Sequence, residues 1–356
     1  MIKSFYKSEK WALWAYGGGV TLILSLWFQV QMTVALNEWY RDFYDLIQNA
    51  SNFKDNPEEG IKLFFSKIIS LEYSKNIKFS NLLNWNFEGE PSFIVIAAPY
   101  IILAVFTSWF TSIYALRWRE AITFSYIPRW QNVKTEIEGA SQRIQEDCYR
   151  FARIVESLGL QIVRSIMTLI AFLPILWELS EGIIVPLIGD QKGSLVYVSL
   201  IVSLGGLIIS WIVGIKLPGL EYKNQKVEAA FRKDLVLGED DKINYAKPEK
   251  LFDLFLGIRF NYHRLFLHTS YFNFWLNLYD QFMSIALLLV MGPGLFTGVI
   301  TFGVLIQANN AFDRVHNSFN IILYNWTTIT ELRSIWKRLF EFEANLDKFL
   351  TEEKSN

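Results

Sequence analysis

The stretch that decides the fold runs from Gln281 to Phe312 and reads QFMSIALLLVMGPGLFTGVITFGVLIQANNAF. Its 32 residues include no charged side chain, and Gly292-Pro293-Gly294 lies near its middle. Each half, with its apolar flank, is long enough to cross a hydrocarbon core of about 30 Å, which takes roughly 20 helical residues. Because neighbouring Gly and Pro favour turns, the pattern predicts two membrane-spanning helices with a hairpin turn at this tripeptide.

Other long uncharged runs surround this hairpin and predict an all-α membrane protein, a class whose usual work is to move something across the membrane. The third span is the shortest in charge-free residues, and it requires that Arg164 be accommodated inside the protein or at the interface. We predict six transmembrane helices, at about 11–36, 91–116, 157–177, 194–215, 266–291 and 295–325.

Composition narrows the function further. Hydrophobic residues make up 52% and aromatic residues 16% of the 356 residues, which suits interfacial belts and a lined cavity. The net charge of −1 does not favour a nucleic-acid partner. The single cysteine, Cys148, excludes an intrachain disulfide and a thiolate metal cluster.

Basic residues predict the orientation. The N-terminal apolar run is about 26 residues long, against roughly 7–15 for a signal peptide, so it is expected to be a retained helix. Alternate segments carry 26 Lys and Arg against seven, which predicts that both termini are cytoplasmic. The outside segment is then 37–90, with a helical start, and the cytoplasmic segments are 117–156 and 216–264.

The cytoplasmic segments are predicted to be helical extensions of the spans. Residues 129–156 are expected to form one charged helix, and residues 219–237 a second. Helices that continue well beyond the bilayer suggest an ABC-exporter-like transmembrane domain, and the whole chain, 1–356, is predicted to be a single transporter domain. The predicted intrahelical ion pairs are Arg143–Asp147, Glu146–Arg150 and Arg153–Glu156.

Several catalytic signatures are absent. The sequence has no G-x-x-x-x-G-K-[ST], no H-E-x-x-H and no G-x-S-x-G, which leaves an ATPase domain within this sequence, a zincin site and serine-hydrolase chemistry without support. His263 and His268 are five residues apart and lie on different helix faces. We therefore predict no metal site, no cofactor and no enzyme activity.

Two polar or aromatic groups are candidate transport residues. Asn309, Asp313, His316 and Asn320 share one face of the sixth span, and an Asp facing lipid would cost roughly 2.5–3.5 kcal/mol. This stripe is expected either to line a cavity or to pack in a dimer. The aromatic residues of the outside helix form either a membrane-surface belt or a periplasmic gate; they are Trp39, Phe43 and Tyr44.

Seven longer motifs in the chain resemble those of a known protein family. They are EWYRDFYDLIQ (38–48), RWR (117–119), EGASQRIQED (138–147), IMTLIAFLP (166–174), VGIKLPGLEYKNQKVEAAFRK (213–233), GEDD (238–241) and NWTT (325–328). Over most of residues 10–345 the chain resembles the SbmA/BacA family of bacterial inner-membrane peptide uptake transporters.

The resemblance implies a symmetric homodimer in membrane lipid, with an ABC-exporter-like membrane fold and no nucleotide-binding domain. It implies proton-driven uptake of antimicrobial or modified peptides and similar bulky cargo. It also implies a glutamate-lined cavity, whose residues match Glu146, Glu156, Glu228 and Glu239 here.

Three of these glutamates have two interpretations. Glu156 and Glu228 are either surface charges or carboxylates in a cavity that alternately fills with water and loses it. Loss of water strongly raises the proton affinity of a glutamate. Glu146 is alternatively a salt-bridge member of the cytoplasmic helix. The chain departs from the family at Thr107-Ser108 and Leu237, and it lacks an N-terminal hydrophobic segment that longer members carry before the position of Trp11. A related branch of the family carries an ATPase domain, so a membrane subunit of an ATP-driven transporter is the alternative.

Overall fold

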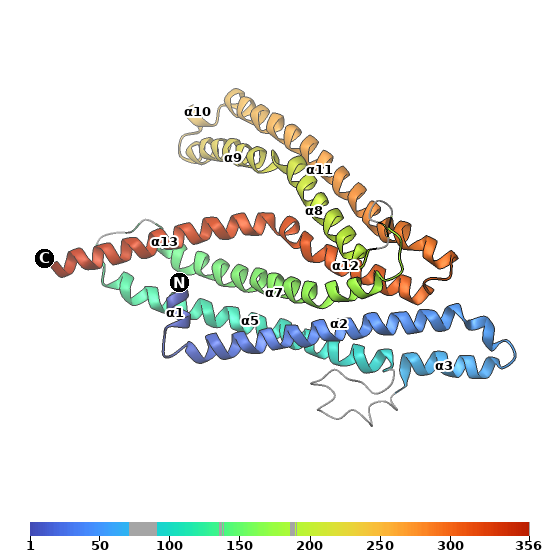
Figure 1. Cartoon of the computed structure of the whole chain (residues 1–356). Coiled ribbons are helices and arrows are strands. Elements are labelled where there is room, and N and C mark those ends of the chain that lie inside the picture. The colour runs from blue at the N-terminus through green and yellow to red at the C-terminus, as the bar shows by residue number, and fades with distance from the viewer. Residues whose placement is uncertain (71–90, 135–136, 138, 186–188, 190, 356) are drawn as a thin grey trace. The chain divides into compact units, whose positions relative to one another are not determined.

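The structure is a computed structural model that describes residues 1–70, 91–134, 137, 139–185, 189 and 191–355. Within these ranges it is almost entirely helical and has no strand, only an isolated bridge between Val185 and Gly189 (Figure 1). The elements are α1 (Ile2–Tyr6), η1 (Leu13–Gly17), α2 (Gly18–Gln48), η2 (Ala50–Phe53), α3 (Pro57–Ile69), α5 (Phe93–Gln131), α6 (Ala140–Gln142), η4 (Arg143–Asp147), α7 (Cys148–Leu179), α8 (Ser194–Gly214), α9 (Leu217–Asp240), α10 (Lys242–Tyr245), α11 (Pro248–Phe296), α12 (Phe302–Tyr324) and α13 (Trp326–Ser355).

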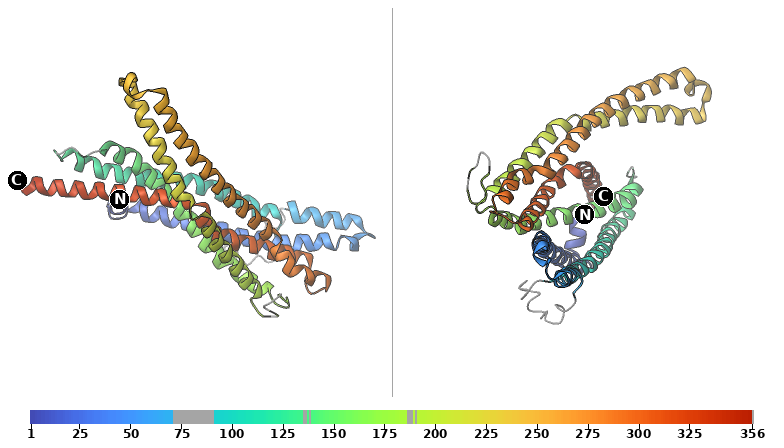
Figure 2. Two further views of the ribbon diagram at one scale, coloured as in Figure 1. Left: turned by 90° about the horizontal axis from the view of Figure 1, so that it is seen from above. Right: turned by 90° about the vertical axis from the view of Figure 1, so that its right-hand side faces the viewer.

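The chain divides into two compact units, the first comprising Met1–Ser199 and Val290–Asn356 and the second Leu200–Leu289. In the first unit α2 packs on α5, α7 packs on both, and α12 packs against α7 and α2. Figures 1 and 2 show α2 and α5 side by side. The main hydrophobic core of this unit gathers fully buried side chains of α5, α7 and α13, among them Tyr126, Phe151 and Leu339.

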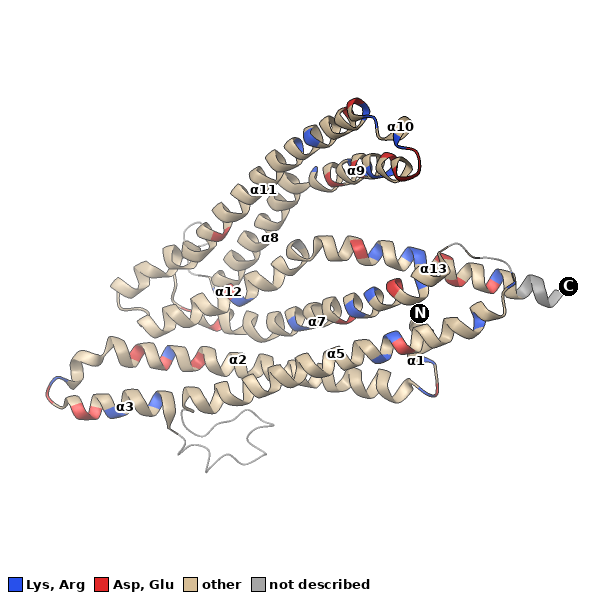
Figure 3. Cartoon of the chain, turned by 180° about the vertical axis from the view of Figure 1, so that it is seen from behind, with Lys and Arg blue, Asp and Glu red and all other residues tan. Residues whose placement is uncertain are grey.

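Five of the predicted spans lie in helices that are long and apolar enough to cross a membrane. These are Leu13–Gln48, Phe93–Gln131, Ala140–Leu179, Ser194–Asp240 and Pro248–Phe296. In Figure 3 the charged residues of α2 and α5 lie toward one end of each helix, and the rest of each helix has no charged residue. The helices continue beyond the predicted spans, and the assignment of those extensions to the cytoplasm stays a prediction.

The sixth predicted span, 295–325, is only partly matched. Its helix, α12, has 23 residues and is therefore roughly 34 Å long. It is not among the five apolar helices, because Asp313, Arg314, His316 and several Asn lower its hydropathy. Four side chains, those of Ala308, Ala311, Phe312 and Val315, are fully buried. A sixth span therefore remains a prediction.

The predicted position of the hairpin turn was wrong. Helix α11 passes through Pro293 and ends at Phe296. Gly298 adopts the left-handed conformation, with φ at 75°, and its N–H donates to the carbonyl of Leu295 (3.4 Å). The Val299 N–H donates to the carbonyl of Gly294 (3.0 Å), which completes a Schellman motif. Pro293 removes one hydrogen bond of the helix, whereas Gly298 reverses the chain, so the turn lies five residues later than predicted.

The prediction of one helix over 129–156 was also wrong. Helix α5 ends at Gln131, where the side chain of Asn132 donates to the carbonyl of Pro128 (2.9 Å). Helix α6 starts at Ala140, directly after Gly139, whose φ is 71°. Helix α6 is followed directly by the π-helical turn η4 and then by α7. Two predicted ion pairs are confirmed, Arg143–Asp147 and Glu146–Arg150, each at 2.7 Å. The third predicted ion pair, Arg153–Glu156, is not formed among the described residues. The guanidinium of Arg153 donates instead to the hydroxyl of Tyr149 (2.6 Å).

The second unit contains most of α8, all of α9 and α10 and most of α11. Along α8 and α11, the indole N–H of Trp275 donates to Ser210 Oγ (2.8 Å), and the Tyr279 hydroxyl donates to the carbonyl of Val202 (3.1 Å). Gly206 leaves room for the Tyr279 ring, which a Cβ there would meet at 2.0 Å. The predicted helix 219–237 is confirmed, as α9 begins at Leu217 with Pro218 in its first turn.

The predicted outside segment, 37–90, begins in helix as expected, because α2 continues through Gln48. It also contains α3, which is not among the predicted helices, although Pro57 followed by Glu58 and Glu59 is a recognisable helix start. The rest of this segment, 71–90, lies outside the described residues.

The orientation can be tested by cysteine labelling. Glu59 and Asp240 are both exposed, whereas the native Cys148 is fully buried and should contribute little background. With Glu59→Cys and Asp240→Cys, we expect an impermeant maleimide to label position 59 in intact cells. Position 240 should be labelled only after the membrane has been permeabilised. Labelling of both positions from the same side would contradict the predicted topology.

Candidate functional site

A polar cavity of about 710 Å³ lies in the first unit among α2, α7 and α12. Its volume is in the range typical of ligand pockets. Most of its lining is polar or charged, which is costly in a membrane domain unless water or a ligand occupies the space. The lining residues are Thr33, Leu36, Asn37, Tyr40 and Tyr44 of α2; Arg164, Ser165, Thr168 and Phe172 of α7; and Ile306, Asn310, Asp313, Arg314, Asn317 and Ser318 of α12.

Arg164 is held within this unit by a hydrogen-bond chain across three helices. Its Nη2 donates to Gln29 Oε1 of α2 (2.8 Å), and Gln29 Nε2 donates to Thr107 Oγ1 of α5 (2.7 Å). Thr107 in turn donates to the carbonyl of Leu103 (2.7 Å). Gln29 and Thr107 are buried, so the chain satisfies their polar atoms and orients the guanidinium. The third predicted span thus accommodates its arginine through a glutamine of the first.

Asn37 lies on the wall of the same cavity and is only 3% exposed. Among the described residues, neither its Oδ1 nor its Nδ2 has a hydrogen-bond partner. A buried amide without partners is unfavourable, since folding removes it from water without replacing the lost hydrogen bonds. Asn37 therefore needs a partner that the described residues do not supply.

The predicted stripe of α12 divides between two environments. Asp313 lines the cavity, beside Arg314. His316 and Asn320 are buried and bond to each other, with 2.8 Å between His316 Nε2 and Asn320 Nδ2. Asn309 is half-buried, and none of these three is among the residues that line the cavity.

The four predicted glutamates also differ in environment. Glu156 is 7% exposed, and its Oε1 has no hydrogen-bond partner among the described residues. Glu146 is paired with Arg150. In the second unit, Glu228 is half-buried and Glu239 is exposed. Glu156 thus lies near the start of the third predicted span as a buried carboxyl whose Oε1 has no hydrogen-bond partner among the described residues.

The three predicted gate aromatics lie at the end of α2. Trp39 is buried in a small core with Ile96 of α5, and Phe43 stacks on it at 4.6 Å between ring centroids. Tyr44 points elsewhere: it lines the cavity and meets the ring of Phe302 edge-on at 5.6 Å. Of these aromatics, Tyr44 is the one placed to affect access to the cavity.

The same end of α2 holds the start of α12. Asp45 Oδ1 accepts the backbone N–H of Gly303 (2.8 Å), and Gln48 Oε1 accepts that of Phe302 (2.8 Å). These two side chains cap N–H groups that have no partner within α12. A Cβ on Gly303 would lie 2.0 Å from the carbonyl oxygen of Arg41, so glycine is required for this close approach.

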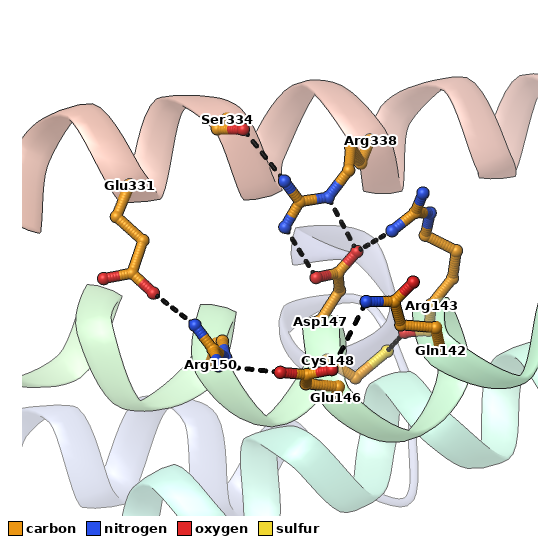
Figure 4. Close-up of polar contacts among 9 residues, drawn as sticks. All are labelled: Gln142, Arg143, Glu146, Asp147, Cys148, Arg150, Glu331, Ser334 and Arg338. Carbon is orange, nitrogen blue, oxygen red and sulfur yellow. Dashed lines mark hydrogen bonds and ion pairs between the residues drawn. The ribbon is translucent and has the colours of Figure 1, made fainter. Parts of the chain in front are cut away.

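At the other end of the unit, an ionic cluster joins η4 and α7 to α13 (Figure 4). Asp147, whose side chain is 2% exposed, accepts hydrogen bonds from Arg338 Nε (3.0 Å) and Nη2 (2.7 Å) and from Arg143 Nη1 (2.7 Å). The bonds to Asp147 raise the pKa of the Arg338 guanidinium above its ordinary value. Beside this pair, Arg150 bridges Glu146 (2.7 Å) and Glu331 (3.0 Å).

No pattern in the sequence assigned Gln29, Thr107 or Asn37 to the site. A signal existed for Gln29, because it is one of few polar residues in the run Trp11–Leu36, but a single amide does not indicate its partner. Asn37 was assigned only to the start of an outside helix. In the part of the chain that the structure describes, no group of three His, Cys, Asp or Glu side chains could hold a metal ion.

Five apolar helices among the described residues, with a polar cavity between helices, define this chain as a polytopic α-helical membrane protein. The chain belongs to the SbmA/BacA-like family, whose pattern it matches over residues 8–347, and it is therefore a membrane transporter of that family.

Its relatives include ABC transporter proteins. The chain is 26% identical over 349 residues to the inner membrane ABC transporter ATP-binding protein YddA of Escherichia coli, covering 92% of this chain and 56% of the relative. It is 26% identical over 273 residues to ABC transporter D family member 2, chloroplastic, of Arabidopsis thaliana, covering 72% of this chain and 36% of the relative. The chain thus spans between about a third and just over half of the length of these relatives.

Proposed function

We propose that this protein is a homodimeric, proton-driven importer of peptides and similar bulky cargo across the bacterial inner membrane, with both termini in the cytoplasm. The observation that carries this proposal is the polar cavity among α2, α7 and α12 in a member of a transporter family. Its cargo is a peptide rather than a nucleic acid, and no cofactor or metal takes part.

Proton coupling needs a carboxyl group that gains and loses a proton as the protein changes conformation. Glu156 supports this role, because it is buried and its Oε1 has no partner among the described residues. Burial without a partner favours the neutral form of a carboxyl, and flooding with water favours the charged form. Glu228, half-buried in the second unit, is proposed as a second coupling group, while Glu146 and Glu239 are proposed to line the transport route together with Asp313, Asn309, His316 and Asn320.

A second copy of the chain is part of the proposal. Arg314 and Asn317 are exposed on α12 in the single chain, within a predicted span. Such side chains face protein or a water-filled space rather than lipid. A C2 dimer around a central aqueous cavity would provide that space, with Trp39, Phe43 and Tyr44 acting as its periplasmic gate.

The second candidate function is the membrane subunit of an ATP-driven transporter whose ATPase is a separate chain. It is favoured by the relatives that are named ATP-binding proteins and are longer than this chain. Uptake by purified protein in liposomes under an imposed pH gradient, without ATP, separates the two. Uptake that requires ATP and a second protein would support the alternative.

We expect Glu156→Gln and Glu228→Gln each to abolish gradient-driven uptake while leaving the fold intact. One proton crossing 100 mV releases about 2.3 kcal/mol, and one pH unit adds about 1.4 kcal/mol. A neutral amide of the same shape carries no proton, so this energy does not reach the transport cycle. The measurement is the initial rate of peptide uptake in proteoliposomes with an imposed gradient.

The matched control is Glu341→Gln on α13, where the carboxyl is exposed and lies 3.9 Å from Lys337. This variant is expected to transport at the wild-type rate. Peptide counterflow, which needs no coupling, should survive in all three variants. Wild-type gradient-driven rates in both coupling variants would show that these glutamates are surface charges only.

A further inference from the structure

The charges on the cavity wall are unequal. The lining contains two arginines, Arg164 and Arg314, and one aspartate, Asp313, so it carries a net positive charge. Among the described residues, Arg164 makes one side-chain hydrogen bond, from Nη2 to Gln29. A guanidinium has five N–H donors in a rigid planar fork that matches a carboxylate. The geometry therefore favours an anionic group beside Arg164 and disfavours an ammonium group.

Asn37 adds a second requirement for the ligand. Asn37 lines the cavity, and its Oδ1 and Nδ2 have no partner among the described residues. Both atoms are closed to water in the free chain, so a ligand reaches them once this side chain turns toward the cavity. An amide presents an acceptor and a donor side by side, and a peptide group presents the complementary pair. A carboxylate alone would satisfy only the Nδ2 donors. The ligand must then offer both an anion and a peptide group.

The spacing along α2 relates these two requirements. Asn37 lies eight residues after Gln29, the residue that holds Arg164, and at 1.5 Å per residue this is roughly 12 Å along the helix. An extended peptide covers that length in three to four residues, at about 3.3–3.6 Å each. The cavity, at about 710 Å³, has the volume of a site for a short segment of chain.

We propose that this cavity is the binding site for the C-terminal end of a peptide cargo. Arg164 binds the terminal carboxylate, and Asn37 pairs with a peptide group three to four residues upstream. Gln29 and Thr107 act as positioning residues, because they hold the guanidinium through the hydrogen-bond chain across α5 and α2. This inference rests on the proposed function, peptide transport, and names the part of the cargo that the cavity recognises.

The test uses the full chain in nanodiscs and two fluorescent hexapeptides of one sequence, one with a free C-terminal carboxylate and one with a C-terminal amide. Binding is measured by fluorescence anisotropy. Wild-type protein should bind the acid roughly 10- to 100-fold more tightly than the amide, as expected for a charge-assisted hydrogen-bond pair. Arg164→Gln should bind the two equally, and Arg164→Lys should retain part of the preference.

Asn37→Leu gives an independent readout, because it should weaken binding of both peptides by about tenfold and leave the preference for the acid unchanged. Its thermal midpoint should equal or exceed that of the wild type, since an unpaired buried amide has been removed. The matched control is Arg333→Gln, an exposed arginine of α13, which should leave both affinities unchanged.

Equal affinity of the wild type for the acid and the amide would overturn the proposed site while leaving peptide transport intact. Unchanged affinities in Asn37→Leu would show that water satisfies this amide and would overturn its role. Absence of binding by either peptide, together with absence of peptide uptake, would instead refute the proposed function and the site with it.

Discussion

Replacing Arg338 with alanine is expected to lower the free energy of unfolding by on the order of 3 kcal/mol, because it leaves the buried carboxylate of Asp147 without its bidentate partner. Arg143 retains one hydrogen bond to Asp147, so the carboxylate keeps part of its compensation. Helix α13 is held to η4 through this pair (Figure 4), and loss of the pair should weaken the contact between α13 and η4.

The measurement is the shift of the thermal unfolding midpoint of purified protein in detergent. Arg333→Ala is the matched control, since this exposed arginine lies in the same helix and should change stability little. A double variant, Asp147→Leu with Arg338→Met, should recover most of the loss, because an apolar pair of similar volume replaces a buried ion pair at little net cost. A double variant as unstable as Arg338→Ala would contradict this account.

Gly303→Ala is expected to destabilise the protein by at least about 2 kcal/mol, the reverse of what the same change does in most helices. Within a helix, Gly to Ala ordinarily stabilises by up to about 1 kcal/mol. Here the new methyl group would lie 2.0 Å from the Arg41 carbonyl oxygen and 2.6 Å from the Asp45 carboxylate. The Arg41 oxygen is backbone and cannot rotate away, so α12 must move from α2 and lose the two side-chain caps at its start.

Gly159→Ala is the control within the same unit, because a Cβ at that position of α7 meets nothing within 4 Å. We expect Gly159→Ala to raise the thermal midpoint slightly and Gly303→Ala to lower it by several degrees. Equal shifts in the two variants would show that α12 does not approach α2 this closely. Because the cavity lies between these helices, uptake should fall with stability in the Gly303 variant.

The sequence by itself determined the class of protein and located five helices that are long and apolar enough to cross a membrane. Uncharged runs of 20 residues or more are a local property of the sequence. In hydrocarbon, an isolated segment must form a helix, because only a helix satisfies its backbone hydrogen bonds within the segment. The ion pairs Arg143–Asp147 and Glu146–Arg150 were predictable for the same reason, since helical spacing alone brings residues four apart together.

Two local sequence patterns predicted the wrong backbone conformation, because residues close to them favoured another one. Gly292-Pro293-Gly294 has the composition of a turn, yet the chain reverses at Gly298, because a proline near the end of a helix costs one hydrogen bond while a left-handed glycine completes a C-cap. The charged run 129–156 looked continuous, but Asn132 and Gly139 interrupt it. Both outcomes depend on backbone conformation at single residues, which hydrophobic periodicity does not determine.

Only the tertiary structure decided the composition of the cavity. Gln29 and Arg164 are 135 residues apart, and Gln29 and Thr107 are 78 apart, so no spacing rule connects them. The stripe of α12 shared one helix face in sequence, but packing against α7 and α2 buried His316 and Asn320 and left Asp313 on the cavity wall. Periodicity determines which side chains share a face. Which neighbour that face meets is determined by contacts between helices, since these arise only once the chain has folded.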